Sequence, residues 1–256
     1  MIRSLYTAVS GLITQEAKQD VITNNLANIN TTSYKSEDIT IKKFKDVLIE
    51  NKDKVDGGQN ISQKIGTMSL GSKIDETILD FKQGMLKHTG KTTDFAIEGK
   101  GFFVVQKGNQ NFYTRDGSFL VDVKGGLITS TGEKVMGKNL QTGAIEQVVV
   151  GNSKISTGEN NSILLDGTPK YTLQTADFQN YDKLKNIGDN LFAGNNPNLN
   201  ARVGVKQGYL EKSNVNVIKQ MIDLMSTMRS FESNQKIVQT IDGTLGKAAN
   251  EVGSVR

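Results

Sequence analysis

The strongest pattern in the chain is a four-three repeat of apolar positions between Ser213 and Leu245. Seven of its nine positions are apolar, and the other two are Gln235 and Asp242. The apolar positions are Val217, Met221, Leu224, Met228, Phe231, Val238 and Leu245. This spacing predicts a long helix that buries a narrow stripe against a partner helix, as in a coiled coil, with the polar positions fixing the register.

Three further apolar residues, Ile218, Ile222 and Met225, widen the stripe along its first turns. A wider stripe indicates that the helix contacts more than one neighbour. Ser213 or Asn214 is the expected N-cap, because either side chain accepts hydrogen bonds from the free N–H groups of a first turn. From this segment alone, a core helix of a globular domain is the alternative interpretation.

The first 29 residues repeat the same spacing. The positions concerned are Ile2, Leu5, Val9, Leu12, Glu16, Gln19, Thr23 and Leu26, five of which are apolar. A helix of this length measures about 40 Å, and so thin a stripe requires a partner. We therefore expect the two chain ends to pair with each other, and other subunits to cover the apolar positions that remain.

Between the helical ends, short β-branched and aromatic runs alternate with glycine-containing turns about every 8–12 residues, which predicts an all-β body. The candidate strands are Phe95–Glu98, Phe102–Gln106, Asn111–Arg115, Phe119–Asp122, Leu127–Ser130 and Glu146–Val150. Residues 39–48 alternate weakly and suit a strand or a short helix. Residues 50–63 are charged and contain glycine, so we expect a loop there.

The predicted fold class is therefore α+β, with N- and C-terminal helices forming a coiled-coil terminal domain and an all-β central body. The expected organisation has three parts. They are a terminal helical polymerisation domain (1–35 and 208–256), a connector region (36–90 and 180–207) and a β-rich central domain (91–179).

Composition and charge narrow the function classes. The chain has no cysteine, which excludes disulfides and thiolate chemistry. Its net charge of +4 comes mostly from lysines spread among acidic residues, without the clustered arginines of nucleic-acid readers. No apolar run approaches the roughly 20 residues of a membrane span, so direct membrane insertion is not expected. The first 15 residues also lack the features of a cleaved secretory signal.

One motif spans the end of the N-terminal helix and the polar run that follows it. Its residues are Asn24, Asn25, Leu26, Ala27, Asn28, Thr31, Tyr34 and Lys35. This run resembles the N-terminal signature of flagellar rod and hook proteins. Ser33 stands where that family usually has glycine, and a serine adopts the turn only at a cost if its φ is positive.

Two further blocks resemble the same family. The β-rich middle contributes Phe81-x-Gln83-Gly84-x-Leu86, Thr89-Gly90, Gly99-x-Gly101-Phe102-Phe103 and Tyr113-Thr114-Arg115-x-Gly117-x-Phe119. The entry to the C-terminal helix contributes Gln207-Gly208-x-Leu210-Glu211-x-Ser213-Asn214-Val215. The resemblance therefore covers nearly the whole chain in three separate blocks.

The resemblance implies a structural subunit of the bacterial flagellar basal-body rod, most like the distal rod type, located in the cell envelope. Such a subunit polymerises into a helical tube that carries torque from motor to hook. The implied partners are further copies of the chain, other flagellar rod and hook subunits, and the flagellar export apparatus. The expected polymerisation interface is Leu5, Val9, Leu12, Leu26, Val217, Met221, Leu224, Met228, Phe231, Val238 and Leu245.

Within this class the alternative is a proximal rod or hook-associated subunit. From a different class, the alternative is a secreted β-rich adhesin or enzyme with a coiled-coil stalk. An adhesin needs a helical stalk at one end only, whereas an enzyme needs a pocket with convergent polar groups.

The residues offer little for chemistry. His88 is the single histidine, so no His/Cys cluster makes a tetrahedral metal site. Gly99-Lys100-Gly101 leads into a strand and lacks the third glycine of a dinucleotide fingerprint. We therefore expect no catalytic, cofactor-binding or metal site, no cofactor, and no enzymatic activity.

Overall fold

The computed structural model divides the chain into two compact units. It describes residues 2–56, 59–158, 161–199, 201 and 203–252. The helical unit is built from Met1–Leu26, Glu37–Ile78 and Val217–Arg256. The β unit is built from Ala27–Ser36 and Leu79–Asn216.

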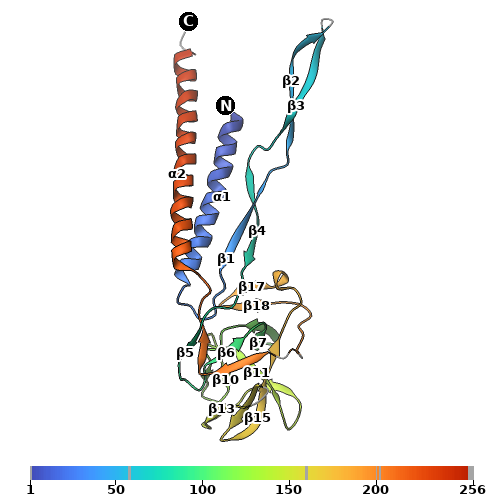
Figure 1. Ribbon diagram of the computed structural model, residues 1–256, viewed down its shortest axis with the longest axis vertical. Coiled ribbons are helices and arrows are strands. Elements are labelled where there is room, and N and C mark those ends of the chain that lie inside the picture. The colour runs from blue at the N-terminus through green and yellow to red at the C-terminus, as the bar shows by residue number, and fades with distance from the viewer. Residues whose placement is uncertain (1, 57–58, 159–160, 200, 202, 253–256) are drawn as a thin grey trace. The chain divides into compact units, whose positions relative to one another are not determined.

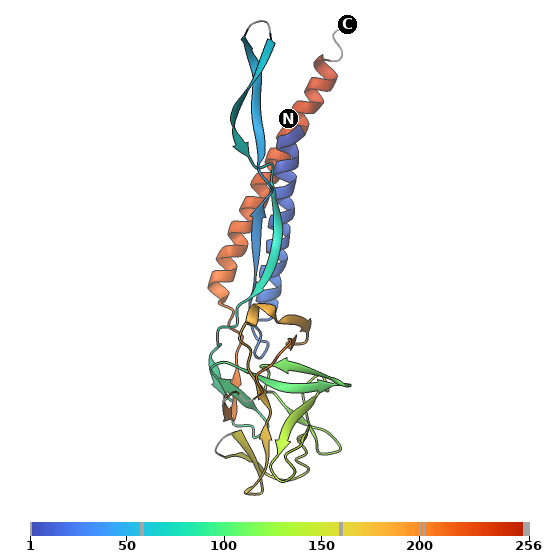
Figure 2. The same cartoon turned by 90° about the vertical axis from the view of Figure 1, so that its right-hand side faces the viewer.

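Two long helices dominate the helical unit. Helix α1 spans Ile2–Ala27, and α2 spans Val217–Lys247 and ends in a π-helical turn, Ala248–Val252. They lie side by side in both ribbon views (Figures 1 and 2). Their close approach falls at Gly11, where a Cβ atom would lie 2.9 Å from the Nδ2 atom of Asn234. A coiled-coil packing of the two helices stays a prediction.

Two antiparallel ribbons complete the helical unit. Strand β1 (Glu37–Lys43) pairs with β4 (Ser72–Leu79), and β2 (Val47–Asp56) pairs with β3 (Gln59–Met68). The connection between β3 and β4, together with the first residue of β4, binds α1. The Thr7 hydroxyl donates to the Leu70 carbonyl at 3.0 Å, and the Ser72 N–H donates to the Ser10 hydroxyl at 3.3 Å.

The ribbons correct one expectation and resolve another. The prediction of a loop over residues 50–63 is wrong, because strands cover its described backbone on both sides of residues 57 and 58, which lie outside the described residues. Cross-strand pairs such as Glu50–Lys64 carry polar side chains, so no hydrophobic alternation marks these strands. In the range 39–48, the strand interpretation is confirmed.

The described residues of the β unit contain the remaining strands and a 3₁₀ turn. The strands are β5 (Leu86–His88), β6 (Phe95–Glu98), β7 (Phe102–Lys107), β8 (Gln110–Thr114), β9 (Leu120–Val121), β10 (Leu127–Ile128), β11 (Lys134–Asn139), β12 (Ile145–Gln147), β13 (Ile155–Thr157), β14 (Ser162–Leu165), β15 (Thr168–Leu173), β16 (Thr175–Ala176), β17 (Lys185–Gly188), β18 (Leu191–Ala193), β19 (Gly204–Gln207) and β20 (Tyr209–Glu211). The 3₁₀ turn is Tyr181–Lys183, capped by the Asn180 side chain.

One 12-stranded sheet organises this unit, with the main order β13-β14-β15-β11-β7-β8-β18-β17. Strand β7 lies near its centre, and four consecutive residues of it are buried. Phe103 and Val105 belong to one hydrophobic cluster, whereas Phe102 and Val104 belong to another. The continuous apolar run therefore reflects a strand that is covered on both faces.

The α+β class, with a helix at each end of the chain and a large β body, is confirmed. All six candidate strands overlap a β strand, although three of these strands are shorter than expected. The N-cap prediction is wrong, because α2 begins at Val217 and the Asn214 side chain binds other segments. The predicted domain boundaries stay a prediction.

Candidate functional site

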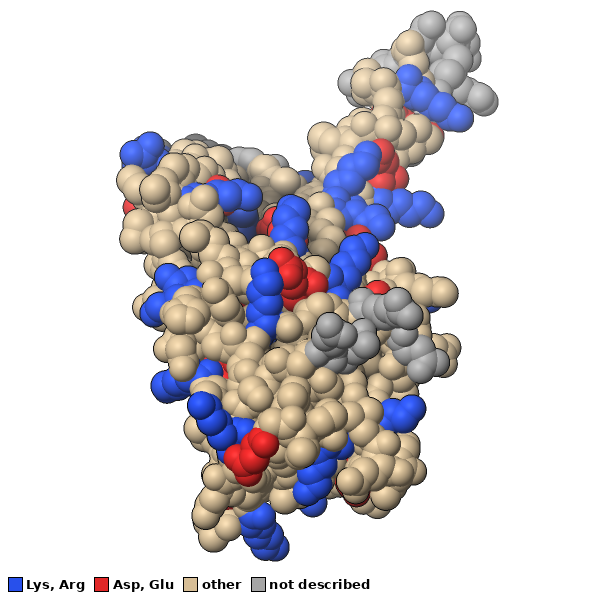
Figure 3. Space-filling model, turned by 60° about the horizontal axis from the view of Figure 1, so that its bottom comes forward, with Lys and Arg blue, Asp and Glu red and all other residues tan. Residues whose placement is uncertain are grey.

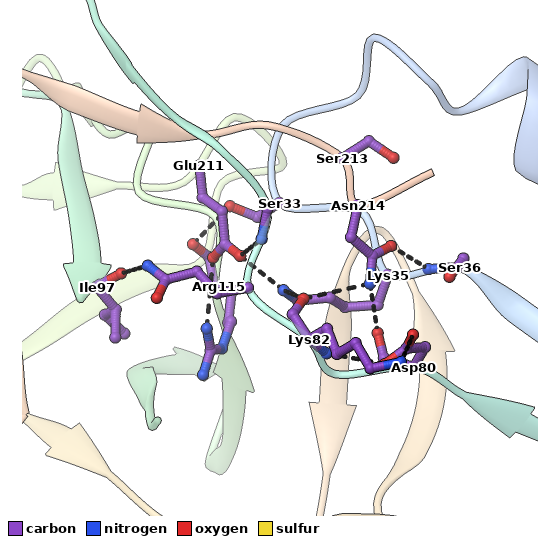
Figure 4. A network of polar contacts seen from close by, with 12 residues as sticks. Ser33, Lys35, Ser36, Asp80, Lys82, Ile97, Arg115, Glu211, Ser213 and Asn214 are labelled. Atoms are coloured by element: carbon purple, nitrogen blue, oxygen red, sulfur yellow. Dashed lines mark hydrogen bonds and ion pairs between the residues drawn. The ribbon is translucent and has the colours of Figure 1, made fainter. Parts of the chain in front are cut away.

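Three segments far apart in the sequence meet in a buried polar cluster of the β unit (Figure 4). We call this cluster the polar junction; it consists of Ser33, Lys35, Arg115, Glu211 and Asn214. Each of these residues lies in or beside one of the three sequence blocks that resemble flagellar proteins. The fold therefore joins these separate blocks into one site.

The centre of the polar junction is an ion pair between Lys35 and Glu211. The Lys35 Nζ atom lies 2.7 Å from Glu211 Oε1, and neither side chain is exposed to solvent. Nζ also donates to the Lys82 carbonyl at 2.8 Å, while Oε1 accepts from the Gly84 N–H at 2.7 Å. Burial lowers the pKa of the Lys35 ammonium group from its usual value, although the Glu211 carboxylate opposes this shift. The additional hydrogen bonds offset part of the desolvation cost of the pair.

Arg115 is the second cation of the polar junction. Its Nη2 atom donates to the Gly99 carbonyl at 2.8 Å, and its Nη1 atom lies 3.5 Å from Glu211 Oε2. The guanidinium also lies over the Phe102 ring, 5.5 Å from the ring centroid. Arg115 therefore links the ion pair to the aromatic cluster around Phe102.

Ser33 occupies the turn in which the family usually has glycine. Its φ of +56° is left-handed, so a side chain here carries a conformational cost. The Ser33 N–H donates to the Glu211 carbonyl at 2.8 Å, and its buried hydroxyl donates to the Arg115 carbonyl at 2.7 Å. The hydroxyl makes a bond that glycine lacks, which offsets part of the cost of the turn.

Two glycines of the family-like blocks are required by close backbone approaches. A Cβ atom on Gly84 would lie 2.0 Å from the Lys212 carbonyl oxygen. On Gly117 it would lie 1.7 Å from the Phe95 carbonyl oxygen. Any side chain at either position would displace the neighbouring backbone, so packing around the polar junction explains these motif positions.

The remaining N-terminal motif residues are divided between local and longer contacts. Asn25 is buried, and its side chain exchanges two hydrogen bonds with the Glu37 backbone, at 2.7 and 2.9 Å. The Thr31 hydroxyl donates to the Asn28 side chain at 3.1 Å. Tyr34 is buried, Leu26 is half-buried, and Asn24 and Ala27 are exposed. The motif therefore fixes a turn and does not form one surface.

The expected interface residues fall into two groups by exposure. Three of them are exposed: Val217, Met221 and Met228. The others are half-buried: Leu5, Val9, Leu12, Leu26, Leu224, Phe231, Val238 and Leu245. On α2, the half-buried positions recur every seven residues and share a stripe with the buried Thr227. That these residues contact other subunits stays a prediction.

A second buried carboxylate lies away from the polar junction, at the start of β11. Glu133 accepts hydrogen bonds from the hydroxyls of Thr129 and Thr131, and the Lys107 ammonium lies 3.1 Å from Oε1. Burial raises the pKa of Glu133, but these donors and its own N–H outweigh burial and lower the pKa to about 2. The ionised Glu133 carboxylate therefore stabilises the turn that contains Thr129 and Thr131.

His88 makes a packing contact. It is exposed at the end of β5, opposite Tyr209 of β20, with ring centroids 4.9 Å apart in an edge-to-face arrangement. Within the described part of the chain, no group of three or more His, Cys, Asp or Glu residues is placed to hold a metal ion. No described helix combines the length and apolar character that a membrane span needs. On the face drawn in Figure 3, basic side chains are scattered among acidic and uncharged ones.

Comparison with known proteins identifies the family. Three family models match: residues 5–35 match "Flagella basal body rod protein", residues 96–168 match "Flagellar hook protein FlgE/F/G D1 domain", and residues 206–251 match "Flagellar basal body rod FlgEFG protein C-terminal". The flagellar basal-body rod protein FlgG of Bacillus subtilis is 33% identical over 270 residues, covering 98% of this chain and 99% of the relative. The chain belongs to the flagellar basal-body rod protein family.

Other relatives agree with this assignment. FlgG of Borreliella burgdorferi is 33% identical over 98% of each chain, and the rod protein FlgF of Rhizobium meliloti is 30% identical over the full length of both. The predictions of the family, of a structural role in the flagellar rod and of a location in the basal body are confirmed. The relatives described here are named as rod proteins, and none of these names describes an enzyme.

Sequence reasoning named the members of the polar junction only as motif positions. It predicted no partner for Arg115 or Glu211. It also predicted Asn214 as a possible helix N-cap, which the structure contradicts. A weak signal was present, because each of Lys35, Arg115 and Glu211 lies within two residues of an aromatic or apolar residue, namely Tyr34, Tyr113 and Leu210. Charges in such a context are buried in pairs.

Proposed function

We propose that this chain is a subunit of the distal part of the rod, which polymerises through its terminal helices into a helical tube and transmits torque from motor to hook. Contacts that repeat between unlike surfaces, without closing a ring, generate such a tube. The proposed partners are further copies of the chain, other rod and hook subunits, and the flagellar export apparatus, which exports the chain unfolded. The FlgG names of the 33% identical relatives support the rod role.

The observation that carries polymerisation is an exposed apolar face on α2. It consists of Ile218, Met221, Ile222, Met225 and Met228, which are 46 to 72% exposed. A contiguous apolar surface of this kind marks a protein interaction site. Methionine side chains adapt to neighbours of different shape, which suits contacts within a polymer.

The test compares Ile222→Asp with two control aspartate substitutions on α2. Ile222 is 61% exposed, so Ile222→Asp should change the stability of the isolated protein by no more than about 0.5 kcal/mol. In the polymer, a carboxylate on this face costs several kcal/mol per contact unless it stays hydrated, so incorporation into rods should be lost. Secretion, rod incorporation and thermal melting are to be measured together.

Two controls separate the faces of the helix. Leu224→Asp alters the half-buried stripe, so it should lower the stability of the helical unit and also prevent assembly. Gln239→Asp adds the same charge at an exposed polar position and should leave both properties unchanged. Wild-type levels of rods from the Ile222→Asp protein would show that this face is not an interface.

The second candidate is a proximal rod position, which the 30% identity to FlgF supports. Expressing the chain in strains that lack FlgG or FlgF separates the two positions. Restoration of motility only in the strain without FlgG supports the distal position. Restoration of motility only in the strain without FlgF assigns the chain to the proximal position.

A further inference from the structure

The chain crosses the boundary of the β unit close to one side chain of the polar junction. The chain enters this unit at Ala27, leaves it after Ser36, returns at Leu79 and leaves again after Asn216, so it crosses the boundary four times. Asn214 lies two residues before the last crossing. Ser36 lies at the second crossing and Asp80 lies beside the third. Three of the four crossings, whose flanking chain we call the exit segments, are therefore near Asn214 in sequence or in space (Figure 4).

A single carboxamide binds all three segments. The Oδ1 atom of Asn214 accepts from the Ser36 N–H at 2.8 Å. Its Nδ2 atom donates to the Asp80 carbonyl at 2.6 Å and to the Lys82 carbonyl at 3.2 Å. The contacts join positions 178 and 134 residues apart in the chain.

Backbone hydrogen bonds parallel the carboxamide. The Asn214 N–H donates to the Tyr34 carbonyl at 3.3 Å, and the Asp80 N–H donates to the Ser36 carbonyl at 2.8 Å. The segments around Ser36, Asp80 and Asn214 therefore form a closed set of bonds in which each segment contacts the other two. The Lys35 and Glu211 side chains also link these three segments, through the Lys82 carbonyl and the Gly84 N–H. The Asn214 amide differs from them because it contacts Ser36 and Asp80, next to the positions where the chain crosses the boundary of the unit.

The buried ion pair fixes the base of this arrangement. Lys35 Nζ and Asn214 Nδ2 both donate to the Lys82 carbonyl, at 2.8 and 3.2 Å. Lys35 precedes Ser36, and Glu211 precedes Asn214 by three residues, so two of the exit segments start from residues of the ion pair. The Lys35–Glu211 ion pair holds the three segments near each other. The Asn214 carboxamide then connects Ser36 and Asp80 to Asn214.

The chemistry of the site requires an amide. One acceptor must meet the Ser36 N–H while a donor on the same group meets two carbonyl oxygens. A carboxylate of the same size has no donor for the carbonyls, and a hydroxyl is too short to serve both directions. The contacts therefore explain an asparagine at this position without an N-capping role.

We propose that Asn214 is a positioning residue, which holds together, within the β unit, three of the four segments at which the chain enters or leaves that unit. This inference rests on the proposed rod function for its purpose, because a subunit that transmits torque needs stiff connections. It adds a specific residue to that function.

The experiment is amide hydrogen exchange on the full-length protein, comparing wild type with Asn214→Ala. The Ser36 amide should exchange at least tenfold faster in the variant, because its acceptor is removed. The Ser33 amide, which donates to the Glu211 carbonyl, should keep its protection. The matched control is Ser213→Ala, since the Ser213 hydroxyl accepts only a 3.3 Å bond from the adjacent Val215 N–H.

Two results would overturn the inference. Unchanged exchange at Ser36 in the Asn214→Ala protein would show that the carboxamide does not hold this segment. An equal rise at Ser33 and in β7 would show that Asn214 is an ordinary stabilising residue of the whole unit. Rod assembly is measured in parallel: if the wild-type protein does not enter rods, the proposed function fails, while the exchange result still decides the role of Asn214.

Discussion

Ser33 shows how one residue combines a cost and a compensation. The left-handed φ of Ser33 is unfavourable for any residue with a side chain. The hydrogen bond from its hydroxyl to the Arg115 carbonyl offsets part of this conformational cost. The family pattern shows that Ser33 stands where glycine is usual. It does not reveal the bond, because the acceptor lies 82 residues away.

Ser33→Gly should therefore be nearly neutral, within about 1 kcal/mol, because relief of the turn offsets the lost hydrogen bond. Ser33→Ala keeps the strained turn and loses the bond, so it should destabilise the β unit by about 1–3 kcal/mol. Urea unfolding of both variants measures the difference. Equal destabilisation by glycine and alanine would show that the turn carries no strain.

Glu133 makes a prediction about acid stability. Its folded-state pKa of about 2 lies below the ordinary carboxyl value of 4.5, so the folded state binds fewer protons than the unfolded state between these values. Its contribution to stability is fully present above about pH 4.5 and is lost as the pH falls towards 2. In urea titrations at pH 6, 4 and 3, Glu133→Gln should weaken the dependence of stability on pH in this range. An unaltered dependence would assign the acid sensitivity to other carboxyl groups.

At the scale of elements, α2 shows what a repeat predicts and what it leaves open. The four-three spacing located the helix, which ends two residues beyond the last repeat position. It did not separate the faces, because seven-residue spacing relates Leu224, Phe231, Val238 and Leu245 on the half-buried stripe, while Met221 and Met228 on the same repeat are exposed. Which apolar positions a neighbour covers depends on packing that the repeat does not contain.

The β elements show a similar limit. Strands whose faces are both buried, such as β7, give apolar runs that sequence patterns identify well. Strand β11 was not among the candidates, although three consecutive residues, Val135, Met136 and Gly137, are buried. Gly137 approaches the backbone of β15, where a Cβ atom would lie 3.1 Å from the Thr172 carbonyl oxygen. A glycine lowers the strand signal at the place where close packing requires it.

At the scale of the molecule, substitutions in the polar junction test whether distant sequence blocks depend on each other for stability. Lys35→Met should destabilise the β unit by about 3–5 kcal/mol, because it leaves Glu211 buried without its closest cation. Lys82→Met is the matched control. Its Nζ atom lies 3.2 Å from Asp80 Oδ2, but the Lys82 side chain is 84% exposed, so this loss should be about 0–1 kcal/mol.

Calorimetry and urea unfolding on the two lysine variants give the comparison. A small effect of Lys35→Met, equal to that of Lys82→Met, would mean that Arg115 and the Gly84 N–H suffice for the Glu211 carboxylate. The sequence predicted the class of the fold and the family, because both depend on local patterns and motifs. It did not predict the junction, because its contacts join residues more than 80 positions apart.

This separation has a consequence for the order of folding. Lys35 bonds Glu211 across 176 residues, and loops of this length close slowly because their entropy is lost before the contact forms. A chain that emerges from a narrow channel with its N-terminus first cannot make this contact until residue 211 has followed. In a chain that emerges in this order, the β unit therefore lacks this ion pair until residue 211 has emerged, shortly before α2.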